Sequence, residues 1–281
     1  MSRRTAAWLA WSLWAVCVVL IGLALLLDFL ISEAASDSIS IGKPGQRPGF
    51  GLALLTGVLS LASPTVGALI ASRLPANPIG WLFCGMGLLY TGQRFSIAYA
   101  DYALLENFAF HPGAEYVAWF STLLDFKWLL LAGVFVMLLF PNGRLLSRRW
   151  RIVAWMALCG VVLTTLADAF YPEALSAHSW VLNPFGVEGV IGGGITTYEL
   201  FDATTLVGEA LLLASILAAL FSLILRLRRA REDEREQLKW FLYAAVPATV
   251  CLNLVLSYSI VATYERVDAH RGTAASRRLP P

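Results

Sequence analysis

The chain has 281 residues, of which 58% are hydrophobic and 14% are charged, and its mean hydropathy is +0.68. A chain with so few polar residues cannot cover a soluble globular surface, so we expect lipid to surround it. The formal net charge of +2 is too small to indicate a nucleic-acid partner.

Seven apolar runs follow one another, each near the roughly 20 residues that a helix needs to cross the hydrocarbon layer. They cover residues 6–27, 51–72, 79–100, 116–140, 152–170, 200–225 and 240–263. None shows the alternation of barrel strands, so the sequence predicts an all-α fold, a polytopic transmembrane helical bundle of about seven spans. The first run is too long for a cleavable signal peptide and is expected to remain as an anchor. Residues 264–281 are expected to form a short, polar, disordered tail.

The basic residues favour one orientation. With the N-terminus in the cytoplasm, the inner side takes the bases at 3–4, 73, 144–151 and 226–239, whereas the outer stretches 101–115 and 171–199 contain no Lys or Arg. The positive-inside rule therefore predicts a multi-pass cell-membrane protein with a cytoplasmic N-terminus. Seven spans then leave the C-terminus and its arginines outside. The last run either crosses fully or, because it contains Pro247 and Asn253, enters only in part.

The stretch RLPANPIGWLF, residues 73–83, joins the second run to the third in about six residues. Pro75 and Pro78 stiffen this reversal by fixing φ. Asn77 is placed to cap the next helix, with Pro78 in the first turn, where a missing N–H costs nothing. Trp81 then falls at headgroup depth. These residues predict a rigid cytoplasmic hairpin in preference to a ligand site.

Four ionisable residues lie well inside the predicted spans: Arg94, Asp125, Lys127 and Glu209. Each costs roughly 2.5 to 3.5 kcal/mol at a helix centre, so we expect them to face one another or water. On one continuous helix, Asp125 and Lys127 point about 200° apart and are expected to find partners on other helices. At about 1.5 Å per residue, Arg94, Asp125 and Glu209 fall in the outer half of the membrane.

Three interpretations of this group remain open: an ion-pair network that holds the bundle together, an outward-opening pocket that binds a signal, or a proton or ion pathway. The pocket interpretation predicts that Glu209→Gln changes the response to an external signal without preventing insertion. Loss of folded protein in this variant would favour the ion-pair network.

Other features have simpler explanations. Gly192–Gly194 follows no predicted strand and lacks the Lys-Ser/Thr of a phosphate loop, so we interpret it as a connector. His111 and His178 lie in outer loops and are too few for a metal centre, so no metal and no cofactor is expected. Acids and bases alternate over residues 226–239, including Arg228 with Glu232, and predict a solvated helix that extends the sixth span.

Several stretches together resemble a known family. The stretches RLPANPIGWLF, YADYAL, LLFPNGRLLSRRWR and SLILRLRRAREDEREQLKWFLYA are similar to parts of the multispanning N-terminal membrane region of actinobacterial sensor histidine kinases. The likeness covers residues 69–246. Its cytoplasmic motif residues in this chain are Asn77, Pro78, Trp81, Arg144 and Trp240. Asn142 and Leu146 stand where the family has an acidic residue and a proline.

The resemblance implies a non-catalytic membrane sensor or signal-input module of two-component type. We expect no enzyme activity, because phosphoacceptor and ATP-binding regions are missing and about 18 tail residues cannot build them. The expected partners are membrane lipid and either a separate cytoplasmic kinase or a second copy of the chain. A truncated kinase would show the same features. The alternative function is a small transporter or channel, which the apolar inner halves of the spans disfavour.

Overall fold

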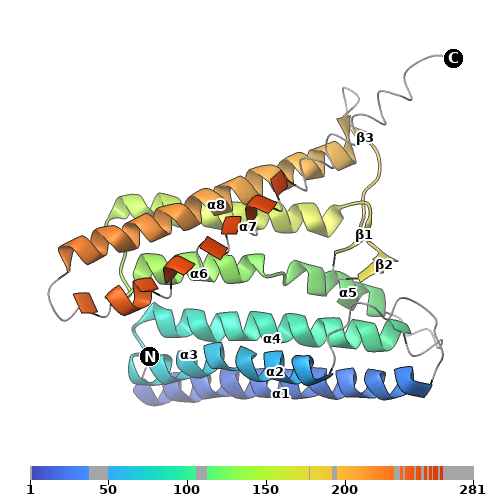
Figure 1. The fold of residues 1–281 in the computed structure, drawn as a ribbon, viewed down its shortest axis with the longest axis horizontal. Coiled ribbons are helices and arrows are strands. Elements are labelled where there is room, and N and C mark those ends of the chain that lie inside the picture. The colour runs from blue at the N-terminus through green and yellow to red at the C-terminus, as the bar shows by residue number, and fades with distance from the viewer. Residues whose placement is uncertain are drawn as a thin grey trace. The chain divides into compact units, whose positions relative to one another are not determined.

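The computed structural model describes residues 2–37, 50–105, 113–176, 178–191 and 195–230, and it describes 235–261 except for residues 237, 244, 248, 249, 252, 255 and 259. Regular structure in these ranges is almost entirely α-helical (Figure 1), so the expected all-α class is confirmed. The chain forms two compact units. The first contains Met1–Leu129 and Ala174–Pro184, and the second contains Leu130–Glu173 and Phe185–Pro281.

The first unit is built on three mutually packed helices. Its elements are α1 (Arg3–Asp37), α2 (Phe50–Ser60), α3 (Ala62–Arg73), α4 (Pro78–Leu105), α5 (Ala114–Leu123), β1 (Ala174–Leu175) and β2 (His178–Leu182). α1 packs against α3 and α4, α3 packs against α4, and α4 also packs against α5. Where the N-terminal half of α1 meets α3 and α4, the core consists of small side chains: Ala10, Ala68, Ala71 and Cys84.

Small residues allow the backbones of α3 and α4 to approach closely. A Cβ atom added at Gly67 would lie 2.5 Å from the backbone nitrogen of Cys84, and one added at Gly80 would lie 2.6 Å from the backbone nitrogen of Ala71. Such contacts are typical of helices packed in membranes. Lipid provides no hydrophobic driving force between helices there, so they associate through close van der Waals contact.

We expect Gly67→Ala to destabilise the protein by about 1 to 3 kcal/mol, because the added methyl group overlaps backbone atoms that cannot rotate away. The matched control is Gly85→Ala on α4, since a Cβ there would meet no atom within 4 Å. Unfolding by a denaturing detergent, followed by circular dichroism, measures both variants. Equal midpoints for the two would contradict the close α3–α4 packing.

The second unit contains the rest of α6 and the helices that follow it. Its elements are α6 (Lys127–Leu139, beginning in the first unit), a short 3₁₀ helix (Arg148–Trp150), α7 (Arg151–Phe170), β3 (Val190–Ile191), β4 (Ile195–Thr196) and α8 (Thr197–Arg229). α7 and α8 pack together through glycines, since a Cβ at Gly160 would lie 2.7 Å from the carbonyl oxygen of Gly208. A reciprocal capping box between Thr196 and Glu199 begins α8.

Among the described residues, five stretches are long and apolar enough to cross a membrane: Arg3–Ile31, Gly51–Arg73, Ala114–Leu139, Arg148–Phe170 and Thr197–Arg229. They overlap five of the seven predicted runs, as expected for a membrane protein. The predicted run 79–100 lies inside α4, which has 28 residues but is made less apolar by Gln93, Arg94 and Asp101. In the run 240–263, every described residue up to 261 has helical backbone. The predicted tail, 264–281, lies outside the described residues.

Two runs predicted as continuous helices are interrupted. The run 51–72 breaks at Leu61 between α2 and α3, because Pro64 has no N–H to donate to the preceding turn. The run 116–140 breaks at residues 124–126 between α5 and α6. There the Asp125 carboxylate accepts a hydrogen bond from the N–H of Phe126, at 2.6 Å, in competition with the helical pattern.

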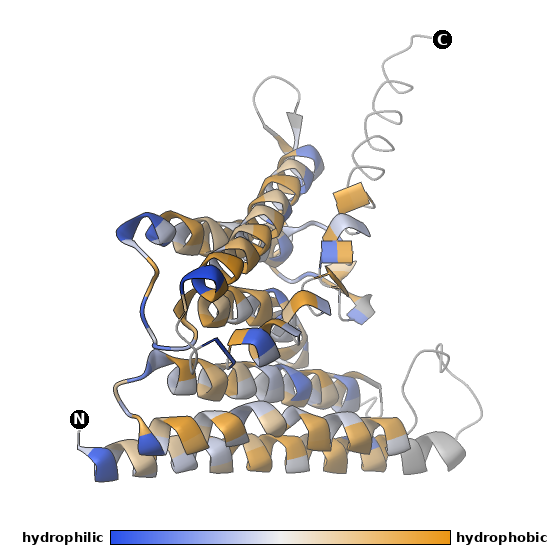
Figure 2. Ribbon diagram, turned by 60° about the vertical axis from the view of Figure 1, so that its left-hand side comes forward, coloured by the Kyte–Doolittle hydropathy of each residue, from blue (hydrophilic) through white to orange (hydrophobic). Residues whose placement is uncertain are grey.

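Two short β-hairpins lie in a stretch that was predicted as loop. β1 pairs with β2, and β3 pairs with β4, both antiparallel. The glycine run 192–194 lies outside the described residues. Away from these segments, the helices are apolar over most of their length, as the orange ribbon in Figure 2 shows, and strongly polar residues concentrate near their ends.

Candidate functional site: buried ion pairs and an arginine junction

The proline-bracketed hairpin has the predicted cap. Oδ1 of Asn77 accepts a hydrogen bond from the N–H of Ile79 at 3.0 Å, and Pro78 is the first residue of α4. Nε1 of Trp81 donates to the carbonyl oxygen of Pro75 at 3.1 Å and so ties the first turn of α4 to the loop. These bonds are local and hold the turn, which agrees with the interpretation of a structural hairpin.

Arg94 is paired within the first unit. Its guanidinium contacts the carboxylate of Asp28 on α1, and both side chains are about four-fifths buried. The sequence did not single out Asp28, because it comes directly after the first apolar run and was counted as the end of that span. Since α1 continues to Asp37, Asp28 lies inside the helix and faces α4. The sequence signal that could have identified Asp28 as an intramembrane acid is its position directly after an apolar run.

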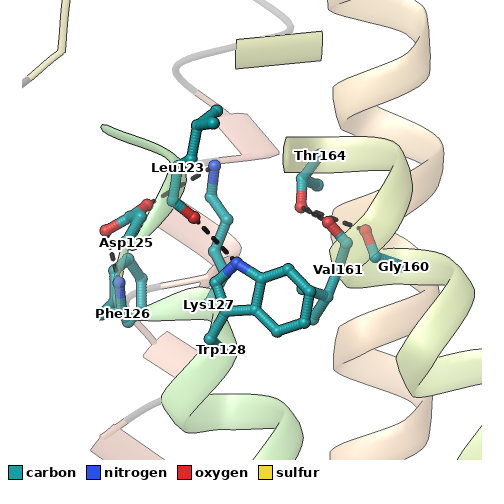
Figure 3. A network of polar contacts seen from close by, with 8 residues as sticks. All are labelled: Leu123, Asp125, Phe126, Lys127, Trp128, Gly160, Val161 and Thr164. Carbon is teal, nitrogen blue, oxygen red and sulfur yellow. Dashed lines mark hydrogen bonds and ion pairs between the residues drawn. The ribbon is translucent and has the colours of Figure 1, made fainter. Parts of the chain in front are cut away.

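Asp125 and Lys127 contradict the geometric prediction made for them. Nζ of Lys127 lies 3.6 Å from Oδ2 of Asp125, so the two residues pair with each other. The predicted separation of about 200° holds on a continuous helix, and the helix is broken between them. Figure 3 shows this break, where Nε1 of Trp128 donates to the carbonyl oxygen of Leu123 at 2.8 Å. The indole thus satisfies a carbonyl group at the end of α5.

A second buried pair was missed by the sequence analysis. Nε2 of His178, on β2, lies 3.4 Å from Oδ1 of Asp101 near the C-terminal end of α4. The His178 side chain is fully buried and that of Asp101 is 16% exposed. His178 had been assigned to an outer loop, and a histidine in a loop carries no sequence signal for burial. Only the folding of the β-hairpin brings it to α4.

Glu209 lies on α8 in the second unit and is 2% exposed. It follows Gly208, where an added Cβ atom would lie 2.8 Å from the carbonyl oxygen of Gly160 on α7. Nearby on α7, the hydroxyl of Thr164 donates to backbone carbonyls of its own helix at 3.0 and 3.1 Å (Figure 3). Of the four predicted intramembrane residues, the structure joins Asp125 to Lys127 and pairs Arg94 with Asp28.

At the C-terminal end of α8, Arg226 binds the turn that follows α6. Its guanidinium donates to the carbonyl oxygens of Phe140 at 2.8 Å and Arg144 at 2.7 Å, and also to that of Leu138. The turn itself needs Gly143, which has φ of 68° and donates its N–H to Leu139. Arg144 therefore takes part through its backbone carbonyl group.

The chain after α8 folds back onto the same place. Ala230 is extended, so the predicted straight extension of α8 through residues 226–239 is wrong, and the proposed partner Glu232 lies outside the described residues. Phe241 stacks on Phe140 with ring centroids 4.1 Å apart, and Leu238 packs on Leu223. The chain turns back after α8 because Leu238 and Phe241 are then buried against Leu223 and Phe140, which a straight extension of α8 would not allow. We call the set Leu138, Phe140, Arg144, Arg226 and Phe241 the arginine junction.

Trp240 lies next to the arginine junction but faces away from its core. It is 73% exposed and forms an edge-to-face pair with Tyr243, which is 72% exposed. Lys239 pairs with Glu236, three residues earlier in the chain, at 2.5 Å. Exposed Trp and Tyr beside charged residues are typical of the interface between lipid and water.

Among the described residues, no group of three His, Cys, Asp or Glu side chains is placed to hold a metal ion. Comparison of the chain with protein-family models, with curated proteins and with solved structures gives no match. The arrangement of ion pairs and the arginine junction therefore carries the functional argument.

Proposed function

We propose that this chain is a non-catalytic signal-input module of the cell membrane, of two-component type, which passes a conformational change to a cytoplasmic kinase or to a second copy of itself. The proposal combines the family resemblance with the geometry of the arginine junction. In this proposal the chain performs no chemistry, and its N-terminus and the ends bearing arginine face the cytoplasm.

The arginine junction is the observation that carries the proposal. Two of the stretches that carry the family resemblance, LLFPNGRLLSRRWR and SLILRLRRAREDEREQLKWFLYA, are far apart in sequence but meet there. One guanidinium holds the end of α8 to the turn after α6, and the chain after α8 packs on both. A helix end fixed in this way moves together with its neighbours, as a module that transmits motion requires.

Each unit separately supports the proposed orientation. In the first unit, Ala10 of α1 packs with Ala71 of α3, so the N-terminal end of α1 and the Arg73 end of α3 lie together. In the second unit, the arginine junction joins the end of α6 to the end of α8, where Arg228 and Arg229 are exposed. Basic residues thus gather at one end of each unit, and the positive-inside rule assigns those ends to the cytoplasm.

Cysteine labelling in intact cells tests the topology of seven spans with the N-terminus inside. In a variant whose four native cysteines are replaced by alanine, we expect an impermeant maleimide to label Ser176→Cys but not Ser147→Cys until the membrane is opened. Both serines are exposed, so accessibility within the fold does not separate them. Labelling of Ser276→Cys from outside is expected if the last run crosses. The reverse pattern for residues 147 and 176 would overturn the orientation.

The second candidate function, a small transporter or channel, is favoured by the two interrupted spans. Broken helices near charged residues are typical of transporter sites, and the break at 124–126 contains Asp125 and is followed directly by Lys127. Their pairing with each other supports a structural role for this break.

Flux through sealed liposomes separates the two functions. With the full chain reconstituted, we expect no proton, sodium or chloride flux above that of empty liposomes, in wild type or in Glu209→Gln. Flux in wild type that Glu209→Gln abolishes would replace the signal-input proposal with transport. Circular dichroism of both proteins confirms that the comparison is between folded chains.

A further inference from the structure

The β1–β2 hairpin is docked onto the C-terminal end of α4 and the middle of α5. Leu175 of β1 is 3% exposed and packs with Ala100 of α4 and Ala118 of α5. Val181 of β2 and Trp119 of α5 complete this apolar contact. Because the two strands have only two and five residues, the hairpin cannot be stable alone and depends on this docking.

His178 is the one ionisable side chain of this hairpin, and it lies on the docked face. Its side chain is fully buried, and Nε2 lies 3.4 Å from Oδ1 of Asp101 on α4. An imidazole takes up or releases a proton between about pH 5 and pH 8, unlike the other side chains nearby. A proton bound by His178 would meet the countercharge of Asp101 directly, and a buried cation requires such a countercharge.

Among the described residues, two other charged side chains lie on the elements packed against the hairpin. On α4, the other charged residue is Arg94, which is engaged with Asp28. On α5 it is Glu115, which is exposed. β1 contains only Ala174 and Leu175.

We infer that His178 and Asp101 form a proton-binding switch whose protonation state sets how firmly the β1–β2 hairpin is held on α4 and α5. Protonated His178 forms a buried ion pair with Asp101, and loss of the proton weakens the docking. The pair acts on the helix that also carries the Arg94–Asp28 ion pair, since Asp101 and Arg94 are seven residues apart and therefore share a face of α4.

The switch gives the proposed module a signal, the proton concentration at the face that holds the hairpin, and this role rests on the proposed function. The proton site itself does not depend on the proposed function. Ion flux that Glu209→Gln abolishes would replace the proposed function but would leave the His178–Asp101 proton site in place. An absent proton site is therefore distinguishable from a wrong function.

Nuclear magnetic resonance of the full chain, labelled with ¹⁵N in its histidine rings and held in nanodiscs, measures the titration directly. The chain has three histidines, and comparison with His178→Gln identifies the His178 signal. We expect this signal to change as the pH is varied, and to change in a different way in Asp101→Asn. A His178 signal that stays constant as the pH is varied would overturn the switch.

Hydrogen exchange of residues 174–182 measures the docking. After correction for the intrinsic exchange rate at each pH, we expect protection about tenfold higher at about pH 5.5 than at about pH 8, the ends of the imidazole range. His178→Gln and Asp101→Asn are expected to remove this difference, whereas the control His111→Gln retains it. Equal protection at both pH values in wild type would overturn the proposal, even if His178→Gln fails to fold.

Discussion

Replacing Arg226 by alanine is expected to lower the free energy of unfolding by about 3 to 5 kcal/mol, because each hydrogen bond from a charged donor contributes about 1.5 to 3 kcal/mol. The guanidinium donates to the carbonyl oxygens of Leu138, Phe140 and Arg144. Water reaches the exposed Arg144, so the three contributions do not add in full. Detergent-induced unfolding followed by circular dichroism measures the loss.

Two further variants isolate the geometry of the arginine junction. Arg229→Ala removes an exposed arginine from the same helix end and is expected to change stability by less than about 0.5 kcal/mol. Arg226→Lys keeps the charge, but one ammonium group cannot reproduce the planar fork, so we expect about half of the loss. Faster hydrogen exchange at residues 238–243 in Arg226→Ala would show that the stacked Phe241 loosens. If Arg226→Ala and Arg229→Ala unfold alike, the junction does not hold α8.

Removal of Arg94 is the second large effect. Arg94→Ala takes away the positive charge that compensates Asp28 between two helices, and we expect a loss of about 3 to 5 kcal/mol, as for other broken buried pairs. In lipid the penalty for an uncompensated charge falls on folding and on insertion together. The amount of folded protein extracted from membranes and its detergent-unfolding midpoint measure the effect.

A double-mutant cycle tests whether Asp28 and Arg94 act on each other. Asp28→Asn combined with Arg94→Gln removes both charges and keeps similar shapes, so the double variant is expected to lose about 1 to 3 kcal/mol less than the sum of the single variants. Additive losses would mean that each residue is held by other groups, and would favour a role for Arg94 in binding a signal.

Local chemistry was enough to predict the hairpin at residues 73–83. Asn77 caps α4 and Pro78 begins it, since capping depends on groups within one turn of the chain. The helix breaks were within reach but were not predicted. Pro64 and Asp125 are both helix-disrupting side chains inside apolar runs, and the hydropathy average over about 20 residues concealed them.

The sequence by itself determined that this chain is helical and belongs in a membrane, because hydropathy and charge add up residue by residue along each run. Only the tertiary structure decided which groups meet. Asp28 and Arg94 are 66 positions apart, and Arg226 and Phe140 are 86 apart. Such pairs depend on which faces of two helices pack together. That choice follows from close fits such as Gly67 against Cys84, for which no single segment carries a signal.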